Sequence, residues 1–358
     1  MNLHNRISAF VDLGKFINLL TNNNMQALSQ QELRKFTNNT EELEKAQDDL
    51  INYFQYSINY NAWFTQEFVL LALNDWANSL QKEKIEEWLS SYHINNQLSE
   101  KTVAVVMAGN LPLVGFHDYL SVLLSGHKIQ AKLSSDDTVL LPILHRILGV
   151  FEPKMIDRAK FTKSLLKNFN AIIATGSNNT SRYFDYYFGK YPNIIRRNRS
   201  GVAILSGDET EKELENLSLD IMTYFGLGCR SVSKLYIPKN YNFNKLFTSL
   251  ESCKHLANHH KFFNNYEYNK AIYLVNSDKH LDTGFLLFKN DTALSSPISV
   301  IYFEEYTNHN SLMSVLEVHK DEIQCIIGKD YIPFGMSQHP QLYDYADGVD
   351  TLQFLSNL

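Results

Sequence analysis

The stretch Tyr224-Phe225-Gly226-Leu227-Gly228-Cys229-Arg230-Ser231-Val232 places a single thiol directly after two glycines. Gly226 and Gly228 can take backbone angles that other residues avoid, which lets a ligand approach the chain closely. We expect residues 229–233 to form one helical turn whose free N–H groups point at the thiol and favour its reactive thiolate form. The stretch therefore predicts that Cys229 is a nucleophile.

A structural role for the same thiol is the alternative. Free cysteine is among the most buried residue types, so the stretch taken alone favours a buried thiol over a reactive one. It is also not a dinucleotide-binding fingerprint, because Ser231 stands in the place of the third glycine. After it, residues 234–237 predict a strand that ends at Pro238. The rest of the chain must decide between the two roles.

Composition places the chain among ordinary globular proteins, with 358 residues, 44% hydrophobic and 20% charged. The formal net charge of -6 gives no electrostatic footprint for nucleic acid or an anionic membrane. Three widely spaced cysteines do not suggest a disulfide framework, and they fit a reducing compartment. Because no signal peptide and no apolar run of membrane-spanning length is present, we expect no membrane span and a cytoplasmic location.

The spacing of apolar residues predicts an α/β fold in four regions. Residues 1–100 repeat apolar side chains every three or four positions, which predicts a helical N-terminal region. Residues 101–207 alternate strands and helices and predict a parallel doubly wound sheet. Residues 208–330 predict a second α/β domain, which contains Cys229. We expect residues 331–358 to return over the other domain or a partner subunit.

Polar residues follow the predicted strands of the second region. Those strands cover residues 102–107, 129–133 and 171–174. Their ends carry Asn110, Lys132, Ser134, Gly176 and Ser177. Parallel doubly wound sheets bind ligands at the carboxyl ends of their strands, so these residues are candidates for a binding site. We expect residues 134–137 to cap a helix that begins near Thr138.

The order of these motifs resembles the aldehyde dehydrogenase superfamily, and more closely its acyl-CoA reductase branch of the bacterial bioluminescence type. The phrase GNLPLVGFHD at residues 109–118 is similar to the branch's loop whose asparagine, here Asn110, helps to hold an oxyanion. The phrase AKLSS at residues 131–135 is similar to the lysine-containing strand end that contacts the adenosine ribose. The resemblance covers the chain from about residue 101 onward.

Four further phrases carry the same resemblance. Thr175-Gly176-Ser177 is similar to the turn at the cofactor phosphates, and Gly226-Leu227-Gly228-Cys229 to the segment with the nucleophile. Residues 296–300 and 333–335 resemble the superfamily's catalytic-domain strand and closing segment. The order of these motifs favours the catalytic interpretation of Cys229 over the structural one. The resemblance also implies that residues 101–207 are a Rossmann-type nucleotide cofactor-binding domain and that residues 208–330 are an α/β catalytic domain.

Two departures from the superfamily pattern refine the implied function. Hydrolytic members release the acyl-enzyme with a glutamate, whereas the corresponding residues 196–201 contain no carboxylate. The glutamate that touches the nicotinamide ribose is also missing, with Ala293 or Leu294 near its place. An acyl-CoA reductase needs no such base, because hydride instead of water resolves the thioester.

The resemblance therefore implies NAD(P)H-dependent reduction of an acyl-CoA, a fatty acyl-CoA by expectation, to the aldehyde through an acyl-cysteine. Cys229 and Asn110 would be catalytic, and the cofactor would bind Lys132, Ser134, Ser135, Gly176 and Ser177. After the strand at residues 129–133, the first acidic residue is Asp136, so no carboxylate directly at the strand end would repel the 2'-phosphate of NADPH. This favours NADPH over NADH. Members of the superfamily are dimers or tetramers, so a homo-oligomer is implied. Aldehyde oxidation, acyl-phosphate reduction, and non-redox acyl transfer through Cys229 stay open as alternatives.

Other reactive side chains receive structural interpretations. A solvated helix face is predicted for the cluster Cys253, His255, His259 and His260. A zinc site would need more acidic or sulfur ligands, so no metal is expected. His117 is interpreted as a hydrogen-bonded histidine at a helix start instead of a substrate ligand. The run Arg196, Arg197 and Arg199 is interpreted as a solvated face instead of a phosphate site, and Cys325 as a buried strand residue.

Overall fold

The computed structural model describes residues 1–94 and 100–358, so the last part of the predicted helical region, residues 95–99, lies outside the described residues. The chain forms two compact units. Unit 1 contains Met1–Arg197 and Gln341–Leu358, and unit 2 contains Asn198–Pro340. The finer division into four regions stays a prediction about which parts fold independently.

The N-terminal part of unit 1 is helical, as the apolar spacing predicts. Its helices are α1 (Leu3–Asn22), α2 (Gln30–Leu33), α3 (Thr40–Tyr60), α4 (Gln66–Ser79) and α5 (Lys82–Ser90). Phe64 and Phe68 are buried, and the Trp76 ring lies 4.5 Å from that of Phe116. These aromatic side chains therefore pack in the core of unit 1.

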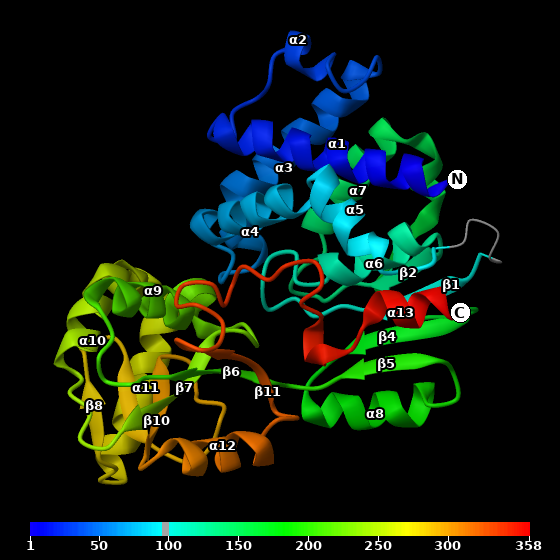
Figure 1. Ribbon diagram of the computed structural model, residues 1–358. Coiled ribbons are helices and arrows are strands. Elements are labelled where there is room, and N and C mark those ends of the chain that lie inside the picture. The colour runs from blue at the N-terminus through cyan, green and yellow to red at the C-terminus, as the bar shows by residue number, and fades with distance from the viewer. Residues whose placement is uncertain (95–99) are drawn as a thin grey trace. The chain divides into compact units, whose positions relative to one another are not determined.

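The first sheet of unit 1 has five parallel strands in the order β3-β2-β1-β4-β5 (Figure 1). The elements are β1 (Thr102–Val106), α6 (Phe116–Ser125), β2 (Lys128–Lys132), α7 (Leu140–Phe151), η1 (Pro153–Arg158), β3 (Ala159–Thr162), β4 (Ala171–Thr175), α8 (Asn178–Phe188) and β5 (Asn193–Arg196). Val103 and Val105 pack with α6 and α7, whereas Ala104 packs with Phe184 and Phe188 of α8. Because successive side chains of a strand point to opposite faces, both faces of this sheet are covered by helices.

The end of the chain returns to unit 1. It contains η4 (Ala346–Gly348) and α13 (Thr351–Ser356), and α13 packs against α6. Leu352 and Leu355 are buried in the same core as α1 and the first sheet. Trp88 Nε1 donates to Tyr345 Oη at 2.8 Å, which ties this segment to the helical region.

Unit 2 contains a six-stranded sheet in the order β11-β6-β7-β10-β9-β8, parallel except for the edge strand β8. Its elements are β6 (Ser200–Ile204), α9 (Glu211–Met222), η2 (Thr223–Gly226), β7 (Val232–Pro238), α10 (Asn244–Leu250), η3 (Glu251–Asn258), α11 (His260–Val275), β8 (His280–Asp282), β9 (Leu287–Asn290), β10 (Val300–Tyr306), α12 (His309–Val318) and β11 (Ile323–Ile327). Helix α12 packs over Val202 and Tyr236 of this sheet, and α11 packs over Leu287 and Val300. The predicted α/β fold with two sheets and N-terminal helices is confirmed.

Several predicted boundaries are wrong. Helix α7 begins at Leu140 after Val139, which makes no side-chain cap, so residues 134–137 form a turn and not a helix cap. The strand expected at residues 296–300 begins only at Val300, because the preceding residues form a turn. Within the described residues, no helix has a stretch that is long and apolar enough to cross a bilayer.

Candidate active site

Cys229 lies on a turn between η2 and β7, and its side chain is exposed. The predicted helical turn over residues 229–233 is wrong, since the Ser231 N–H donates to the Gly228 carbonyl at 3.0 Å and the strand begins at Val232. No helix N-terminus therefore acts on the thiol from its own segment. The chain holds the exposed thiol at the amino end of a central strand of unit 2.

The backbone before the turn is left-handed over three consecutive residues. Tyr224, Phe225 and Gly226 have φ of 55°, 56° and 73°, whereas Gly228 is not in this region. Left-handed backbone costs an L-residue roughly 1–2 kcal/mol, so two non-glycine residues here store strain next to the reactive turn. Phe225 is buried, with its ring 4.4 Å from that of His259, and this packing helps to offset the cost.

Residues 335–338, which we call the brace, hold the turn from the side. The Arg230 Nε donates to the Ser337 carbonyl at 2.6 Å. Gln338 Nε2 donates to Ser231 Oγ at 3.1 Å, and Ser231 Oγ also accepts the Gly228 N–H at 3.2 Å. Ser231 is 2% exposed, so these hydrogen bonds are shielded from water.

Asp220 of α9 anchors the brace in turn. Its carboxylate accepts the N–H groups of Gly335 at 2.6 Å and Ser337 at 2.9 Å. Burial raises the pKa of Asp220, while both N–H donors favour its charged form. Residues 337 and 338, directly after the predicted closing segment, therefore contact the residues that follow Cys229, while Gly335 of that segment binds Asp220.

The other two cysteines are structural. Cys253 is buried, with its Sγ 3.8 Å from the Ser218 carbonyl. Cys325 is buried in β11, and its thiol donates to the Arg230 carbonyl at 3.6 Å. The predictions of a buried Cys325 and of no disulfide framework are confirmed, because all three cysteines are free.

In unit 1, the loops that follow β1 and β2 pack directly on each other. A Cβ on Gly109 would stand 2.5 Å from the Ser134 Cβ, so only glycine fits between the two loops. Asn61 Nδ2 spans them by donating to the Gly109 carbonyl at 3.5 Å and the Asp136 carbonyl at 3.3 Å. The structure thus brings Asn110, which is exposed, and Ser134, which is half-buried, to the same edge of the sheet.

Lys132 and the two serines lie at the carboxyl end of β2. The Lys132 side chain is half-buried and Ser135 is exposed. Ser134 Oγ accepts the Asp136 N–H at 3.3 Å within the turn, so it is not a helix cap. The neighbouring strand β1 continues this edge, since the Met107 N–H donates to the Lys132 carbonyl at 3.0 Å.

Gly176 and Ser177 follow β4, the neighbour of β1 on its other side. A Cβ on Gly176 would stand 2.8 Å from the Phe184 ring, which explains the glycine. Ser177 caps α8, because its Oγ accepts the Thr180 N–H at 3.2 Å. The strand order changes direction between β1 and β4, which is the point where doubly wound sheets bind ligands.

These donors fit a nicotinamide dinucleotide. One cation, two serine hydroxyls and a capped helix N-terminus lie along one edge of a parallel sheet, and phosphate and ribose oxygens accept hydrogen bonds from such groups. Lys132, Ser135 and the N-terminus of α8 are the groups that would hold the cofactor.

Asp137 lies below this edge and was not anticipated as a special residue. Its Oδ2 accepts the Leu113 N–H at 3.4 Å, while its buried Oδ1 has no hydrogen-bond partner among residues 1–94 and 100–358. Burial raises the pKa of Asp137 to about 6. The loop after β2 therefore carries one exposed carboxylate, that of Asp136, and one that is turned into the protein.

Arg196 does not lie on a solvated face, so that prediction is wrong. Its Nη1 and Nη2 donate to the two carboxylate oxygens of Asp118 at 2.5 and 2.8 Å, and both side chains are 7% exposed. Nη2 also donates to Thr351 Oγ1 at 3.0 Å. The end of β5 thus carries a buried ion pair. Arg197 is exposed and donates to Asp185, as a solvated residue does.

The histidines are structural, as predicted for His117. Its Nε2 lies 2.9 Å from the Leu342 carbonyl, and burial lowers its pKa, so the ring is neutral. The Cys253 cluster is no uniform helix face, because His255 lies in η3 while His259 caps α11. Within the described residues, no group of three His, Cys, Asp or Glu side chains could hold a metal ion.

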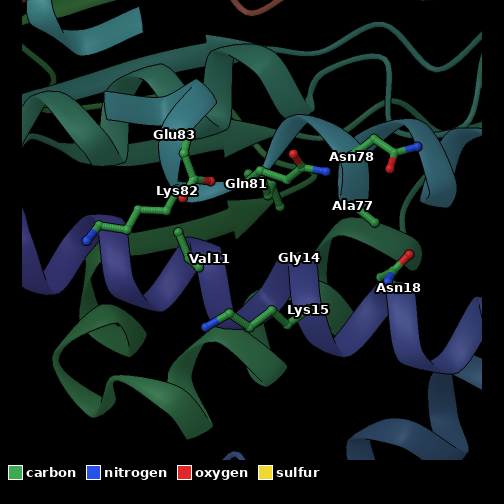
Figure 2. Close-up of a pocket in the computed structure, with 10 residues that line it drawn as sticks. Val11, Gly14, Lys15, Asn18, Ala77, Asn78, Gln81, Lys82 and Glu83 are labelled. Carbon is green, nitrogen blue, oxygen red and sulfur yellow. The ribbon is translucent and has the colours of Figure 1, made fainter. Parts of the chain in front are cut away.

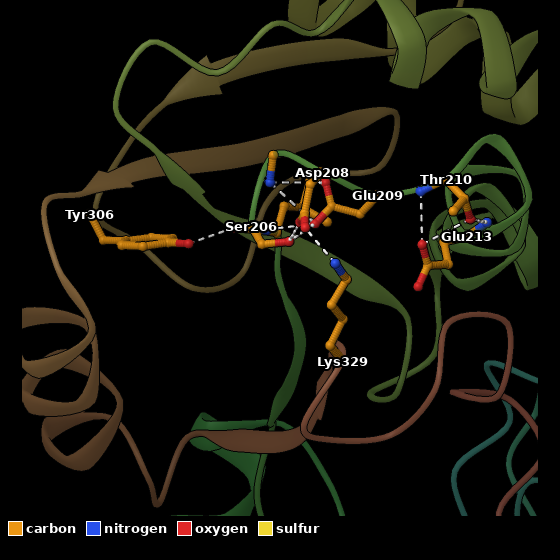
Figure 3. Close-up of polar contacts among 9 residues, drawn as sticks. Ser206, Asp208, Glu209, Thr210, Glu213, Tyr306 and Lys329 are labelled. Carbon is orange, nitrogen blue, oxygen red and sulfur yellow. Dashed lines mark hydrogen bonds and ion pairs between the residues drawn. The ribbon is translucent and has the colours of Figure 1, made fainter.

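Two other polar regions contain none of the predicted site residues. A pocket of about 420 Å³ lies among α1, α4 and α5, with Lys15 and Lys82 at its lining (Figure 2). In the acidic loop after β6, the carboxylates bind groups of the loop and its neighbour (Figure 3). Glu209 accepts the N–H groups of Ser206 and Gly207, and Lys329 forms an ion pair with Asp208 at 2.8 Å. The acidic run therefore organises the start of α9.

Sequence reasoning missed the residues that position the turn. Asp220 carried a signal, because it is a carboxylate on the buried face of α9 beside Leu217 and Ile221. Ser231 was noticed only as a replaced glycine. Gln338 and Asn61 had no signal, since their roles depend on contacts between distant segments.

The comparisons with known proteins concern the fold. No protein-family model and no curated protein matches the chain. Among solved structures, aldehyde dehydrogenase 21 from Physcomitrella patens, in complex with the reaction product succinate, has a TM-score of 0.58 at 12% identity and covers 92% of this chain and 74% of its own.

Two further solved structures agree. The putative aldehyde dehydrogenase PutA from Anabaena variabilis has a TM-score of 0.57 at 11% identity, covering 94% of this chain and 80% of its own. A cysteine-to-alanine variant of aldehyde dehydrogenase C from Pseudomonas syringae, in complex with NAD+ and octanal, has a TM-score of 0.60 at 10% identity, covering 92% and 73%. The chain therefore has the aldehyde dehydrogenase fold.

Proposed function

We propose that the protein reduces an acyl-CoA to the aldehyde with NADPH, through an acyl group carried on Cys229. One observation carries the proposal. Of three free cysteines, Cys229 alone is exposed, and it lies on a turn that is strained on one side and braced on the other. A structural thiol needs neither exposure nor such support.

The reaction begins at the Cys229 thiolate, which attacks the thioester carbonyl. A new carbon–sulfur bond forms, the bond to CoA breaks, and CoA leaves as its thiol after taking up a proton. We assign Asn110 and the Cys229 N–H to the developing oxyanion, which this class of donor stabilises by roughly 3 kcal/mol. The reduced nicotinamide, when bound, would supply the hydride; its addition to the acyl-cysteine gives the anion of a hemithioacetal, whose collapse frees the aldehyde and restores the Cys229 thiolate.

The absence of a carboxylate from residues 196–201 supports reduction over hydrolysis. Release of an acyl-cysteine by water needs a general base. The arginines of this segment cannot serve as one, because a guanidinium stays protonated. This favours acyl-CoA reduction over aldehyde oxidation to the acid.

The choice of NADPH is supported by the loop after β2. Lys132 and Ser135 could contact a ribose phosphate, and the carboxylate of Asp137 is turned inward. Aldehyde dehydrogenase C binds octanal, while aldehyde dehydrogenase 21 binds succinate, so the comparisons do not select an acyl chain length. A cytoplasmic homo-oligomer stays part of the proposal.

The test follows NADPH absorbance with acyl-CoAs of graded chain length, with NADH as comparison. We expect NADPH oxidation that depends on acyl-CoA and is abolished by Cys229→Ala. Cys253→Ala removes a buried thiol in the same unit and should keep activity. Acyl transfer to a partner without NADPH oxidation would support the non-redox alternative, and a covalent acyl-enzyme in Cys229→Ala would refute the assigned nucleophile.

A further inference from the structure

A chain of hydrogen bonds connects the last turn of α9 to both residues that follow Cys229. Asp220 holds the backbone of the brace, and the brace holds Arg230 and Ser231. Ser231 extends this chain of hydrogen bonds to Gly228, because the same Oγ accepts the Gly228 N–H. The residue before the thiol and the two after it are thus fixed by one segment that is more than a hundred residues away in sequence.

The turn needs this support because the backbone before it is strained. Tyr224 and Phe225 are held in the left-handed region, from which a non-glycine residue gains by relaxing. A turn that is exposed at Cys229 and strained at Tyr224 would otherwise exchange among several conformations. Hydrogen bonds to a buried serine oppose that exchange.

We propose that Gln338 and Ser231 are positioning residues that hold Cys229 in its reactive orientation. The proposal rests on the proposed role of Cys229 and names the residues that orient it. Neither residue takes part in the chemistry. Nucleophilic attack depends on orientation to within about an ångström, so loosening the turn slows acyl transfer without removing the thiol.

Two variants of Gln338 separate a hydrogen-bond role from a packing role. Gln338→Leu keeps the size of the side chain and removes its donor. Gln338→Glu restores a hydrogen bond between residues 338 and 231 with donor and acceptor exchanged. The Ser231 O–H can donate to the new carboxylate, while the Ser231 Oγ still accepts the Gly228 N–H. Ser233→Ala is the control, since the Ser233 hydroxyl, in strand β7, donates to the carbonyls of Leu294 and Gly201 instead of to the brace.

The first measurement is amide hydrogen exchange over residues 224–231, which needs no substrate. Losing one such hydrogen bond should speed exchange there about fivefold in Gln338→Leu. Gln338→Glu and Ser233→Ala should exchange like the wild type. If amide exchange in Gln338→Leu equals that of the wild type, the Gln338 side chain does not stabilise the turn. That result would refute the positioning role of Gln338 independently of any enzyme activity.

The second measurement compares two reactions of Cys229. We expect the burst of CoA release from acyl-CoA to slow about fivefold in Gln338→Leu, with KM unchanged, and to recover in Gln338→Glu. Alkylation by iodoacetamide above pH 9 needs only an accessible thiolate and should keep its rate. Equal loss in both reactions would show a merely structural role, whereas absence of CoA release from the wild type would refute the proposed function instead.

Discussion

Replacing Asp137 by asparagine should change how the stability of the protein depends on pH. The Asp137 carboxyl lies in the loop after β2 of unit 1, and burial raises its pKa from the ordinary 3.8 to about 6. The folded protein therefore binds this proton more tightly than the unfolded chain does. The stabilisation is complete below about pH 4, declines as the pH rises toward 6, and is absent above about pH 6.5.

The size of the effect follows from the shift. Two pH units correspond to about 3 kcal/mol of unfolding free energy, and partial access of water to the side chain reduces this to roughly 2–3 kcal/mol. In Asp137→Asn the amide cannot ionise, so that part of the pH dependence should disappear. The Asn oxygen can still accept the Leu113 N–H, which keeps the local hydrogen bond.

Urea unfolding between pH 4.5 and 8, followed by tryptophan fluorescence, measures the effect. Between these limits the wild type should lose about 2 kcal/mol relative to Asp137→Asn. Asp136→Asn is the matched control, because this neighbouring carboxylate is exposed. If both variants keep the wild-type slope, the buried carboxyl is not the group that titrates, and the reasoning is refuted.

Three further variants test separate contacts. Gly201→Ala puts a Cβ 2.6 Å from the carbonyls of Arg230 and Ser231, so it should cost about 1–3 kcal/mol in urea unfolding and lower turnover; wild-type values for both would contradict this packing. Arg196→Met leaves the buried Asp118 carboxylate unpaired and should cost about 3–5 kcal/mol, whereas a loss below about 1 kcal/mol would show that the pair is solvated. Lys132→Ala should raise KM for NADPH roughly tenfold and KM for NADH less, as about 1.4 kcal/mol of a charge-assisted contact implies; equal changes for both cofactors would remove Lys132 from a 2'-phosphate site.

The fold could be predicted from sequence wherever one segment carried its own signal. Val103, Ala104 and Val105 form a short apolar run before a polar loop, which is the mark of a buried parallel strand. Residue types at strand ends likewise predicted that Asn110 and Ser134 lie at one edge. The amphipathic spacing of the N-terminal residues predicted helices whose aromatic side chains face the core.

The errors have a common physical origin in contacts between distant segments. The run Arg196-Arg197-Asn198-Arg199 has the composition of a solvated face, but Asp118 draws Arg196 inward from a helix far away in the chain. The turn at Cys229 was expected to be helical because local rules could not include the brace. Strain at Tyr224 was equally invisible, since nothing in its type predicts a left-handed backbone.

Unit 1 is assembled from two stretches of chain that are separated by the whole of unit 2, and this order affects its synthesis. All five strands of its sheet leave the ribosome long before Leu352 and Leu355, which fill the same core as α1. Until α13 emerges, the nascent unit 1 exposes the apolar surface that this helix covers on α6. Chaperone contact during translation should therefore last until α13 docks.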